Sequence, residues 1–231
     1  MLAAPLFLFL ATTSQKAQSK SFSSSTADQQ NRHALDMNLV EKVHNKLLDR
    51  VVEQDKPIVL IGEEHESLLS FEAHLLLMKK ISDRKIEVNK VIFELDHVSL
   101  GNLSPQRGPV TYILMDTIKD IFGDVFIAGL NRLYKNSESK KIEEDIMSRC
   151  TTDKSKGLIL VFTGINHIVG LKDLAQQNGI KNVSAIDHSF ARPDNYCGYQ
   201  QALLMLAQLK CDYTVMPKSD HKFESKMQCN L

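Results

Sequence analysis

Short runs of β-branched and aromatic residues alternate along this chain with longer stretches of helical periodicity. The runs that predict strands cover residues 58–61, 91–95, 125–129, 158–164, 182–186 and 212–216. The stretches that predict helices, from apolar residues three and four apart, cover 39–51, 68–81, 110–121, 142–147, 171–177 and 200–210. Successive parallel strands need such crossover helices, and these connections are right-handed. The pattern therefore predicts an α/β fold with a mainly parallel central sheet and helices on both faces.

Two further features of the pattern support this prediction. The strand runs are apolar almost throughout, as expected for strands buried on both faces of a sheet. The predicted helix over 171–177 is followed by Asn178 and Gly179, residues that favour the left-handed conformation in which helices end. The first helix is expected to bury one stripe of its surface, formed by Leu39, Val43, Leu47 and Val51.

The N-terminus has the composition of a secretory leader. Ten apolar residues, Leu2 to Ala11, precede small and polar ones, with Ala-Gln-Ser at 17–19 as the cleavage site. The apolar run is too short to span a bilayer as a helix. We therefore expect a signal peptide over 1–19, a flexible linker over 20–36 and a single α/β domain over 37–231, in a protein that is secreted or periplasmic and has no stable membrane span after cleavage.

Charge and motifs exclude several classes of function. Lys plus Arg and Asp plus Glu number 28 each, so the charge balance does not predict nucleic acid as a partner. The chain has no G-x-G-x-x-G, no phosphate-loop lysine motif and no G-x-S-x-G elbow. Nucleotide binding and serine hydrolase chemistry therefore lack their usual signatures, and any site has to be argued locally.

The four cysteines leave two interpretations open. Cys150, Cys197, Cys211 and Cys229 form no C-x-x-C pair, which argues against a zinc ribbon or a thioredoxin-type site. In an exported protein, one or two disulfides would tie down the C-terminal segment over 192–231, whose role the sequence does not reveal. In a reducing compartment the same residues would be buried apolar thiols.

Polar residues gather directly after four of the predicted strands. In chain order they are Gly62, Glu63, Glu64 and His65, then Glu94, Asp96 and His97, then Gly164, Asn166 and His167, and lastly Asp187 and His188. Groups that meet a ligand in an open parallel sheet stand just past the carboxyl ends of its strands. Because Glu94 follows Val-Ile-Phe directly, we expect it to be half-buried and to need a strong partner.

Two of these turns share the spacing Gly-x-x-His, at Gly62–His65 and Gly164–His167. In each, the glycine is expected to turn the chain sharply out of the strand and let a ligand approach, with the histidine near the start of the next helix. Two imidazoles and the carboxylate of Glu94 are a usual ligand set for a catalytic divalent metal such as Mn, Co or Zn. Without metal, one imidazole would be a general base that the glutamate orients.

The remaining histidines are expected to be structural. His74 lies on the predicted helix over 68–81 and is interpreted as a helix-surface or packing residue. Structural roles are also favoured for His97 and His188. The histidines without a strand context, interpreted as surface residues, are His33, His44 and His221.

The order of these motifs resembles a superfamily that groups TraB/TIKI proteins, ChaN-like proteins and erythromycin esterases. The resemblance covers about residues 57–190 and is carried by "LIGEEHES" with Gly62, Glu63 and His65, "VIFELDH" with Glu94, and "FTGINHIVGLKDLAQQNGIKNVSAI" with Gly164 and His167. The last segment is similar to the TraB/TIKI closing motif, whereas "LIGEEHES" is closer to the ChaN-like branch.

The resemblance implies a hydrolase, with two alternative functions. TIKI-like members are metal-dependent proteases and the esterase branch hydrolyses a lactone with histidine and glutamate, which implies peptide or ester hydrolysis by His65, Glu94 and His167, with Glu63 in support. ChaN-like members bind haem, for which the axial ligand would come from the set His65, His97, Tyr196 and Tyr199. The third alternative is a degenerate member that acts as a binding module or secreted effector.

One departure from the TraB/TIKI pattern bears on these alternatives. Members of that branch carry an arginine on the helix before the final motif. Here "NSESKKIEEDIMSR" offers Lys140 and Lys141 first, and Arg149 only at its end. The departure puts in doubt the binding of a substrate carboxylate or oxyanion by arginine, and it gives weight to the degenerate alternative.

Overall fold

This computed structural model describes residues 37–65, 67–106, 108–135, 138–152, 156–191 and 195–215, except for the side chain of His97. The chain divides into two units, Met1–Leu35 and Asp36–Leu231, and the described residues all lie in the second. The predicted signal peptide and the whole of the predicted linker lie outside the described residues, as do His33, His221 and Cys229.

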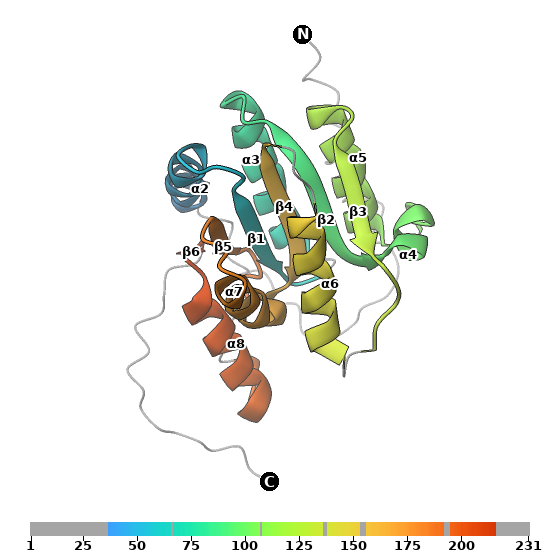
Figure 1. Cartoon of the computed structure of the whole chain (residues 1–231), viewed down its shortest axis with the longest axis vertical. Coiled ribbons are helices and arrows are strands. Elements are labelled where there is room, and N and C mark those ends of the chain that lie inside the picture. Colours follow the sequence, from blue (N-terminus) through green and yellow to red (C-terminus); the bar gives the residue numbers. More distant parts are fainter. Residues whose placement is uncertain are drawn as a thin grey trace, which may run out of the picture. The chain divides into compact units, whose positions relative to one another are not determined.

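A six-stranded sheet, in which every strand pair is parallel, forms the centre of the second unit (Figure 1). Its strands are β1 (Ile58–Glu63), β2 (Val88–Asp96), β3 (Phe126–Leu130), β4 (Leu158–Gly164), β5 (Val183–Asp187) and β6 (Tyr213–Thr214). They lie in the order β3-β2-β4-β1-β5-β6. β4 is therefore inserted between β1 and β2, with Ile61 beside Phe162 in one pair and Phe93 beside Phe162 in the other.

Crossover connections divide the helices between the two faces of this sheet. The helices are α2 (Met37–Val52), α3 (Leu68–Asp83), α4 (His97–Gly101), α5 (Pro109–Phe122), α6 (Ser139–Thr151), α7 (Ile168–Gln177) and α8 (Gly198–Lys210), with a 3-10 turn, η2, at Ile165–His167. Connections through α3 and α5 run toward the β3 edge, and those through α6, α7 and α8 run the opposite way. Right-handed connections of opposite direction cover opposite faces. In Figure 1, α6, α7 and α8 lie in front of the sheet and α3 and α5 behind it.

The strands are buried on both faces, as their composition predicts. Ile58 and Leu60 of β1 belong to a core cluster that includes residues of α6, α7 and α8. Val59 and Ile61, which point to the other side of the pleat, are also almost fully buried. Side chains on both faces of one strand therefore contribute to packing, and the predicted α/β fold with a parallel sheet and helices on both faces is confirmed.

Most predicted elements are confirmed, with differences at three places. The short helix α4, directly after β2, is not among the predicted helices, and β6 is only Tyr213–Thr214. The first helix buries Leu47 and Val51 of the predicted stripe, whereas Leu39 and Val43 are only half-buried. It also buries Val40, His44 and Leu48, so the surface assignment of His44 is wrong. The predicted helix stop is confirmed, since α7 ends at Gln177 and Gly179 has a φ of 68°.

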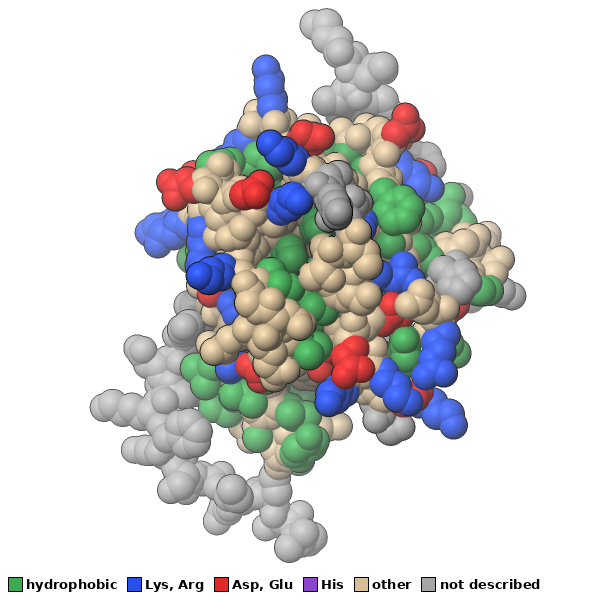
Figure 2. Space-filling model, viewed as in Figure 1, with side chains coloured by type: hydrophobic (Ala, Val, Ile, Leu, Met, Phe, Trp, Pro, Cys, Tyr) green, Lys and Arg blue, Asp and Glu red, His purple; other side chains and the backbone are tan. Residues whose placement is uncertain are grey.

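The described surface and cysteines bear on several expectations. No helix among the described residues is long and apolar enough to cross a membrane. Of the cysteines in the described ranges, Cys150 and Cys211 are buried and Cys197 is exposed, and Cys150 and Cys197 are free thiols. Figure 2 shows charges of both signs spread over one face, with apolar side chains gathered over α8, which exposes Tyr199, Leu206 and Leu209.

Candidate functional site

The three strands that end in the predicted site residues are neighbours in the sheet. β4 pairs with β1 on one side and with β2 on the other, so the carboxyl ends of all three meet at one edge. Glu63 ends β1 and His65 follows two residues later. Glu94 lies two residues before the end of β2, and His167 ends the 3-10 turn η2 that directly follows β4. The structure thus brings the residues singled out from the sequence together at this edge.

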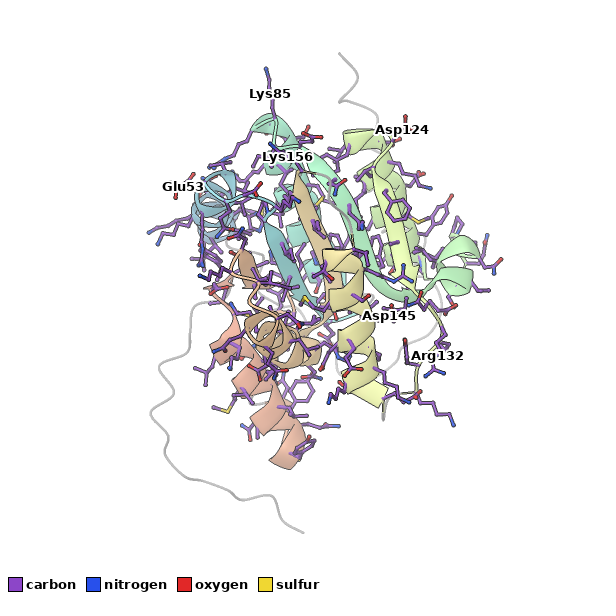
Figure 3. The ribbon with its side chains drawn as sticks, in the orientation of Figure 1. Glu53, Lys85, Asp124, Arg132, Asp145 and Lys156 are labelled. Carbon is purple, nitrogen blue, oxygen red and sulfur yellow. The ribbon has the colours of Figure 1, made fainter. Side chains whose placement is uncertain are left out.

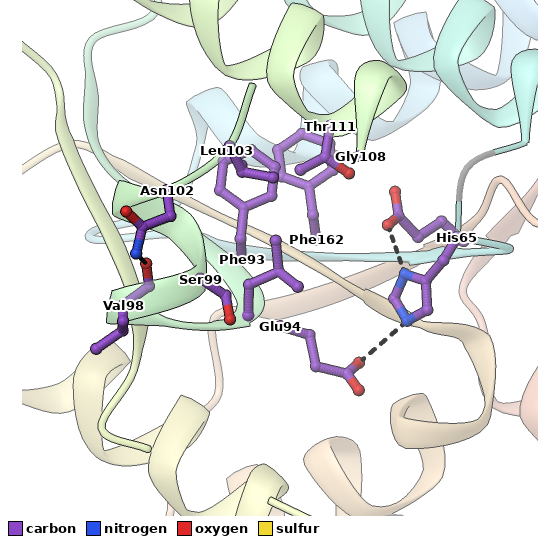
Figure 4. Close-up of a pocket in the computed structure, with 12 residues that line it drawn as sticks. His65, Phe93, Glu94, Val98, Ser99, Asn102, Leu103, Gly108, Thr111 and Phe162 are labelled. Carbon is purple, nitrogen blue, oxygen red and sulfur yellow. Dashed lines mark hydrogen bonds and ion pairs between the residues drawn. The ribbon is translucent and has the colours of Figure 1, made fainter. Parts of the chain in front are cut away.

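The Nε2 atoms of both histidines face the carboxylate of Glu94. His167 Nε2 lies 3.1 Å from Glu94 Oε1, and His65 Nε2 lies 4.0 Å from Glu94 Oε2. Figure 4 shows the contact between His65 and Glu94 at the side of a cavity. The side chain of His65 is 56% exposed, against 14% for His167 and 12% for Glu94. His65 is therefore the member of this trio that a solute reaches most easily.

A second carboxylate contacts the other ring nitrogen of each histidine. Glu63 Oε1 lies 3.0 Å from His65 Nδ1, and Glu143 Oε1 lies 3.2 Å from His167 Nδ1. Ser139 donates a hydrogen bond to Glu143 at 3.0 Å and lies 3.1 Å from the same Nδ1. A carboxylate on one ring nitrogen fixes the orientation of an imidazole and leaves its other nitrogen for chemistry.

Glu94 is held in its ionised form despite its burial. Burial raises the pKa of a carboxyl group, but hydrogen bonds to His167, Thr163 and the backbone of Gly164 outweigh that effect and lower the pKa of Glu94 to about 2. Thr163 Oγ1 donates at 2.6 Å and the Gly164 N–H at 2.7 Å. The expectation that Glu94 is half-buried and strongly partnered is confirmed.

The carboxylates favour protonation of both histidines. Burial lowers the pKa of His167, but its hydrogen bonds with Glu143 and Glu94 outweigh burial and raise the pKa to about 9. The hydrogen bond to Glu63 raises the pKa of His65 above its ordinary value, against the effect of burial. At neutral pH His167 is therefore protonated beside an ionised Glu94, and His65, whose imidazole is the more exposed, has its pKa raised by Glu63.

The glycines of the two Gly-x-x-His units differ in their place on the strand. Gly62 lies inside β1, so the prediction that it turns the chain out of the strand is wrong. Gly164 is the last residue of β4 and directly precedes the 3-10 turn η2, so the chain leaves the strand there as predicted, with a φ of −55°. A Cβ on Gly62 would lie 2.5 Å from Ile165 Cδ1. A Cβ on Gly164 would lie 3.4 Å from His65 Nε2 and 3.6 Å from Glu94 Oε2. Gly62 therefore makes room for η2, and Gly164 keeps the backbone open at the centre of the site.

A third glycine makes room for one of the supporting carboxylates. Gly170 lies in the first turn of α7, and a Cβ there would lie 1.9 Å from Glu143 Oε2 and 2.2 Å from Glu143 Cδ. Real Cβ atoms do not approach heavy atoms so closely, so the carboxylate occupies the space that a side chain at 170 would need. The glycine in "HIVGL" is thus explained by the position of Glu143.

Glu143 and Ser139 are the members of the site that the sequence argument missed. Both lie on α6, which the periodicity predicted only over 142–147 and which extends over Ser139–Thr151. A signal for Glu143 is present, because it precedes the buried Ile146 and Met147 by three and four residues and thus shares their side of the helix. An acid on the buried side of a helix needs a partner, and here the partner is His167.

Two other carboxylates after the strands, those of Asp187 and Asp96, bond to nearby turns. Asp187 accepts hydrogen bonds from the backbone N–H and the hydroxyl of Ser189, and burial raises its pKa. Asp96 caps α4 through the N–H groups of Val98 and Ser99. These carboxylates stabilise turns beside the site and are not part of the histidine–glutamate centre.

Three buried histidines lie behind the site. His44 Nε2 lies 3.0 Å from His188 Nε2, and the ring centroid of His74 lies 5.2 Å from that of His188. His74 also approaches the site, since its Nε2 lies 3.4 Å from Glu63 Oε2, close enough for an ion pair but not aligned as a hydrogen bond. Burial lowers the pKa of His44 and His74 to about 3, and it also lowers the pKa of His188 well below its ordinary value. All three are neutral packing residues, as expected for His74 and His188.

Two cavities open beside the trio. A cavity of about 520 Å³ is bounded by α4, the start of α5, and the ends of β2 and β4 (Figure 4). A cavity of about 340 Å³ is bounded by η2 and α8. The residues that line both are Glu63, His65 and Glu94. A molecule in either cavity therefore lies against the same histidine and the same carboxylates.

The donor atoms of the trio fit a metal in kind but not in present spacing. Two imidazole nitrogens and one carboxylate are a usual ligand set for a catalytic divalent ion. Within the described ranges, however, no group of three or more His, Cys, Asp or Glu side chains is spaced to hold an ion, since His167 is ion-paired directly with Glu94. Of the residues considered as haem ligands, Tyr196 lines the smaller cavity and Tyr199 is 78% exposed, while the His97 side chain lies outside the described atoms.

The cations considered as replacements for the TraB/TIKI arginine have other partners. Arg149 donates to Asp145 at 3.2 Å and to Asn131 at 2.6 Å, on the part of α6 where Figure 3 labels Asp145. Lys140 pairs with Glu144, and Lys141 donates to Glu138. None of these three cations is among the residues that line the two cavities. The departure noted in the sequence therefore extends to the described site.

Comparisons with known proteins give no match: no protein-family model matches the sequence, and searches of curated proteins and of solved structures find no significant similarity. The resemblance to the TraB/TIKI, ChaN-like and erythromycin esterase superfamily thus stays a prediction.

Proposed function

We propose that this protein is a hydrolase that cleaves an ester or peptide bond with a water molecule activated at the trio His65, Glu94 and His167. The observation that carries the proposal is the convergence of two histidine Nε2 atoms on one carboxylate, with a separate carboxylate on each Nδ1. A cluster of titratable groups with perturbed pKa values beside an open cavity is a candidate functional site. The arrangement matches an acid–base centre in a cleft.

Without a metal, His65 is the general base. Its side chain is the most exposed of the trio, and its Nδ1 contacts Glu63, so the pair forms a carboxylate–imidazole dyad. The neutral form of His65 takes a proton from water as the water attacks the acyl carbon, and the adjacent Glu63 stabilises the imidazolium that forms. The imidazolium then gives this proton to the leaving alcohol or amine as the acyl–oxygen or acyl–nitrogen bond breaks. His167 and Glu94 supply a fixed pair of opposite charges beside the reacting atoms.

A divalent ion is the cofactor that the same donor atoms would take. His65, Glu94 and His167 would hold it, and the carboxylates on the two Nδ1 atoms are the partners that ligating histidines usually have. When bound, such an ion lowers the pKa of a coordinated water toward neutrality. The role of Glu63 and Glu143 is the same in both cases, because each fixes the ring and tautomer of its histidine.

Two substitutions and a matched control test the proposal. His65→Gln and His167→Gln should each lower hydrolysis of a panel of short-chain esters and a mixed peptide library by about 100-fold or more. Glu72→Gln, on the exposed side of α3, should leave hydrolysis unchanged. Full activity in both histidine variants would refute the assignment.

Elemental analysis of the purified protein separates the two mechanisms. Stoichiometric Mn, Co or Zn that is lost in His65→Gln and His167→Gln assigns the metal to the trio. Activity in a sample without any of these ions, and unchanged by a chelator, assigns the reaction to the metal-free dyad of His65 and Glu63.

A further inference from the structure

The two cavities beside His65 differ in chemistry, and this difference bears on the substrate. Both are lined by Glu63, His65 and Glu94, so they are the two sides of one reaction centre. A substrate whose scissile bond lies at His65 therefore extends into both. This inference rests on the proposed hydrolase function, and it concerns which chemical groups flank the bond that is cleaved.

The larger cavity offers mainly apolar surface. Phe93 and Phe162 stack on one another with ring centroids 5.1 Å apart, and Leu95, Val98 and Leu103 complete the apolar part of the wall. Val98 is 57% exposed. Figure 4 labels Phe93, Phe162 and Leu103, which all line this cavity, close together in the view.

Two polar side chains of the larger cavity are already bonded within the protein. Ser99 Oγ donates to Asp96, and Asn102 Nδ2 donates to the carbonyl of Val98 at 2.8 Å. The Ser99 hydroxyl hydrogen and one amide hydrogen of Asn102 are thus engaged at the start and the end of α4. Most of the side chains that remain for a ligand to contact in this cavity are aromatic or branched, and these offer van der Waals contact.

The smaller cavity carries amide groups at the protein surface. Asn166 of η2 and Gln200 of α8 line it, and both side chains are exposed. Tyr196 lies between them along the chain and packs against the core cluster. A primary amide offers both a donor and an acceptor, so this side suits a peptide-like or hydroxyl-bearing group.

We infer that the substrate is an extended ester or amide with unlike ends. An apolar acyl or alkyl chain lies in the larger cavity over Phe93 and Phe162, and an amide-bearing or hydroxyl-bearing portion lies in the smaller cavity at Asn166 and Gln200. The scissile bond between the two portions lies at His65.

Esters with matched ends test both parts of this inference. Carbamoylmethyl esters of acetic, butyric and hexanoic acid carry the amide on the alcohol side, and isobutyl esters of the same acids are similar in shape but lack it. Alkyl malonamates reverse the ester, so the experiment covers both directions of binding. In one direction, kcat/KM should rise about fourfold for each added methylene, and the carbamoylmethyl esters should exceed the isobutyl esters.

Substitutions of similar size assign each preference to its cavity. Leu103→Asn should reduce the rise to under about twofold for each methylene, because it replaces apolar wall with a polar amide of equal length. Asn166→Leu should remove the preference for the amide and leave the dependence on chain length. Leu209→Asn, on the exposed side of α8 outside both cavities, is the control for a leucine-to-asparagine change.

The results separate this inference from the proposed function. Hydrolysis that depends on His65 but shows no dependence on chain length in either series would overturn the inference and leave the hydrolase standing. If no ester is hydrolysed, calorimetry with hexanoylglycinamide and acetylglycinamide decides: binding at least tenfold tighter for the hexanoyl compound, lost in Leu103→Asn, supports the two-sided site. Equal or absent binding of both compounds overturns it.

Discussion

Replacing Gly170 by alanine should destabilise the protein even though alanine favours a helix more than glycine does. The new Cβ would lie 1.9 Å from Glu143 Oε2, so the carboxylate must leave its position. That movement breaks the contact with His167 Nδ1 at 3.2 Å and the hydrogen bond from Ser139 at 3.0 Å. A hydrogen bond to a charged group contributes about 1.5–3 kcal/mol to stability.

The opposing effect is the intrinsic preference of helices for alanine. Alanine in place of glycine stabilises a helix by about 0.5–1 kcal/mol. Since the two lost contacts outweigh this gain, the free energy of unfolding of Gly170→Ala should fall by about 2–5 kcal/mol. The pKa of His167, about 9 in the native protein, should fall as well, because Glu143 is one of the two groups that raise it.

Urea denaturation and an NMR titration of His167 measure these two effects. Gly101→Ala is the matched control, because a Cβ on Gly101, the last residue of α4, meets nothing within 4 Å. The double variant Glu143→Ala/Gly170→Ala removes the obstructing carboxylate, so there the alanine at 170 should stabilise relative to Glu143→Ala alone. A Gly170→Ala protein as stable as Gly101→Ala, with the His167 pKa unchanged, would refute the explanation.

Three further substitutions follow from the site and its surroundings. Gly62→Ala should lower the free energy of unfolding by about 1–3 kcal/mol in urea melts, because its Cβ would lie 2.5 Å from Ile165 Cδ1, and Ile165→Ala in the same chain should restore part of the loss. Glu63→Gln should move the acid limb of the kcat/KM profile to lower pH, because hydrolysis needs neutral His65 and the bond to Glu63 raises its pKa; an unmoved limb would exclude the dyad. Burial lowers the pKa of His44 from its ordinary value of 6.5 to about 3 in the folded protein, so the stability that its neutral form contributes above pH 6.5 is lost as the pH falls. His44→Gln should therefore reduce the loss of unfolding free energy between pH 7 and 5 by about 2 kcal/mol relative to the native protein. Equal pH dependence of the two unfolding free energies would contradict this.

The sequence predicted the elements well because each strand and helix carries its own periodicity. The run 158–164 coincides with β4, and the alternation of strands and helices led to the parallel sheet. Strand order was not accessible in the same way, because periodicity does not say which strands are neighbours. The insertion of β4 between β1 and β2 is therefore known only from the structure.

In the candidate site, the residues that follow strands could be predicted from the sequence, whereas the one inside a helix could not. His65, Glu94 and His167 could be singled out because they follow strands, and the ends of parallel strands share an edge. Glu143 lies in the middle of a helix, where an acid is most often on the solvated side. Only the packing of α6 against α7 brings it to His167.

His44 shows how a polar residue type can mislead. It lies three and four residues before Leu47 and Leu48, all on the buried side of α2, but it was assigned to the surface because it follows no predicted strand. A neutral imidazole beside another neutral imidazole satisfies part of its hydrogen bonding in the interior, since His44 contacts His188 at 3.0 Å. Helical spacing was a better guide to its burial than the absence of a strand before it.

The insertion of β4 between β1 and β2 also determines when the site comes into being. β1 pairs only with β4 and β5 among the described strands, so in a nascent chain shorter than Leu158 it has no hydrogen-bonded neighbour. Contacts so distant in sequence are costly in loop entropy and slow to form. Glu94 receives the hydrogen bonds of Thr163 and Gly164 only when β4 is in place. The reaction centre therefore assembles only when β4 joins β1 to β2, and an N-terminal fragment that ends before β4 should have neither the centre nor a paired β1.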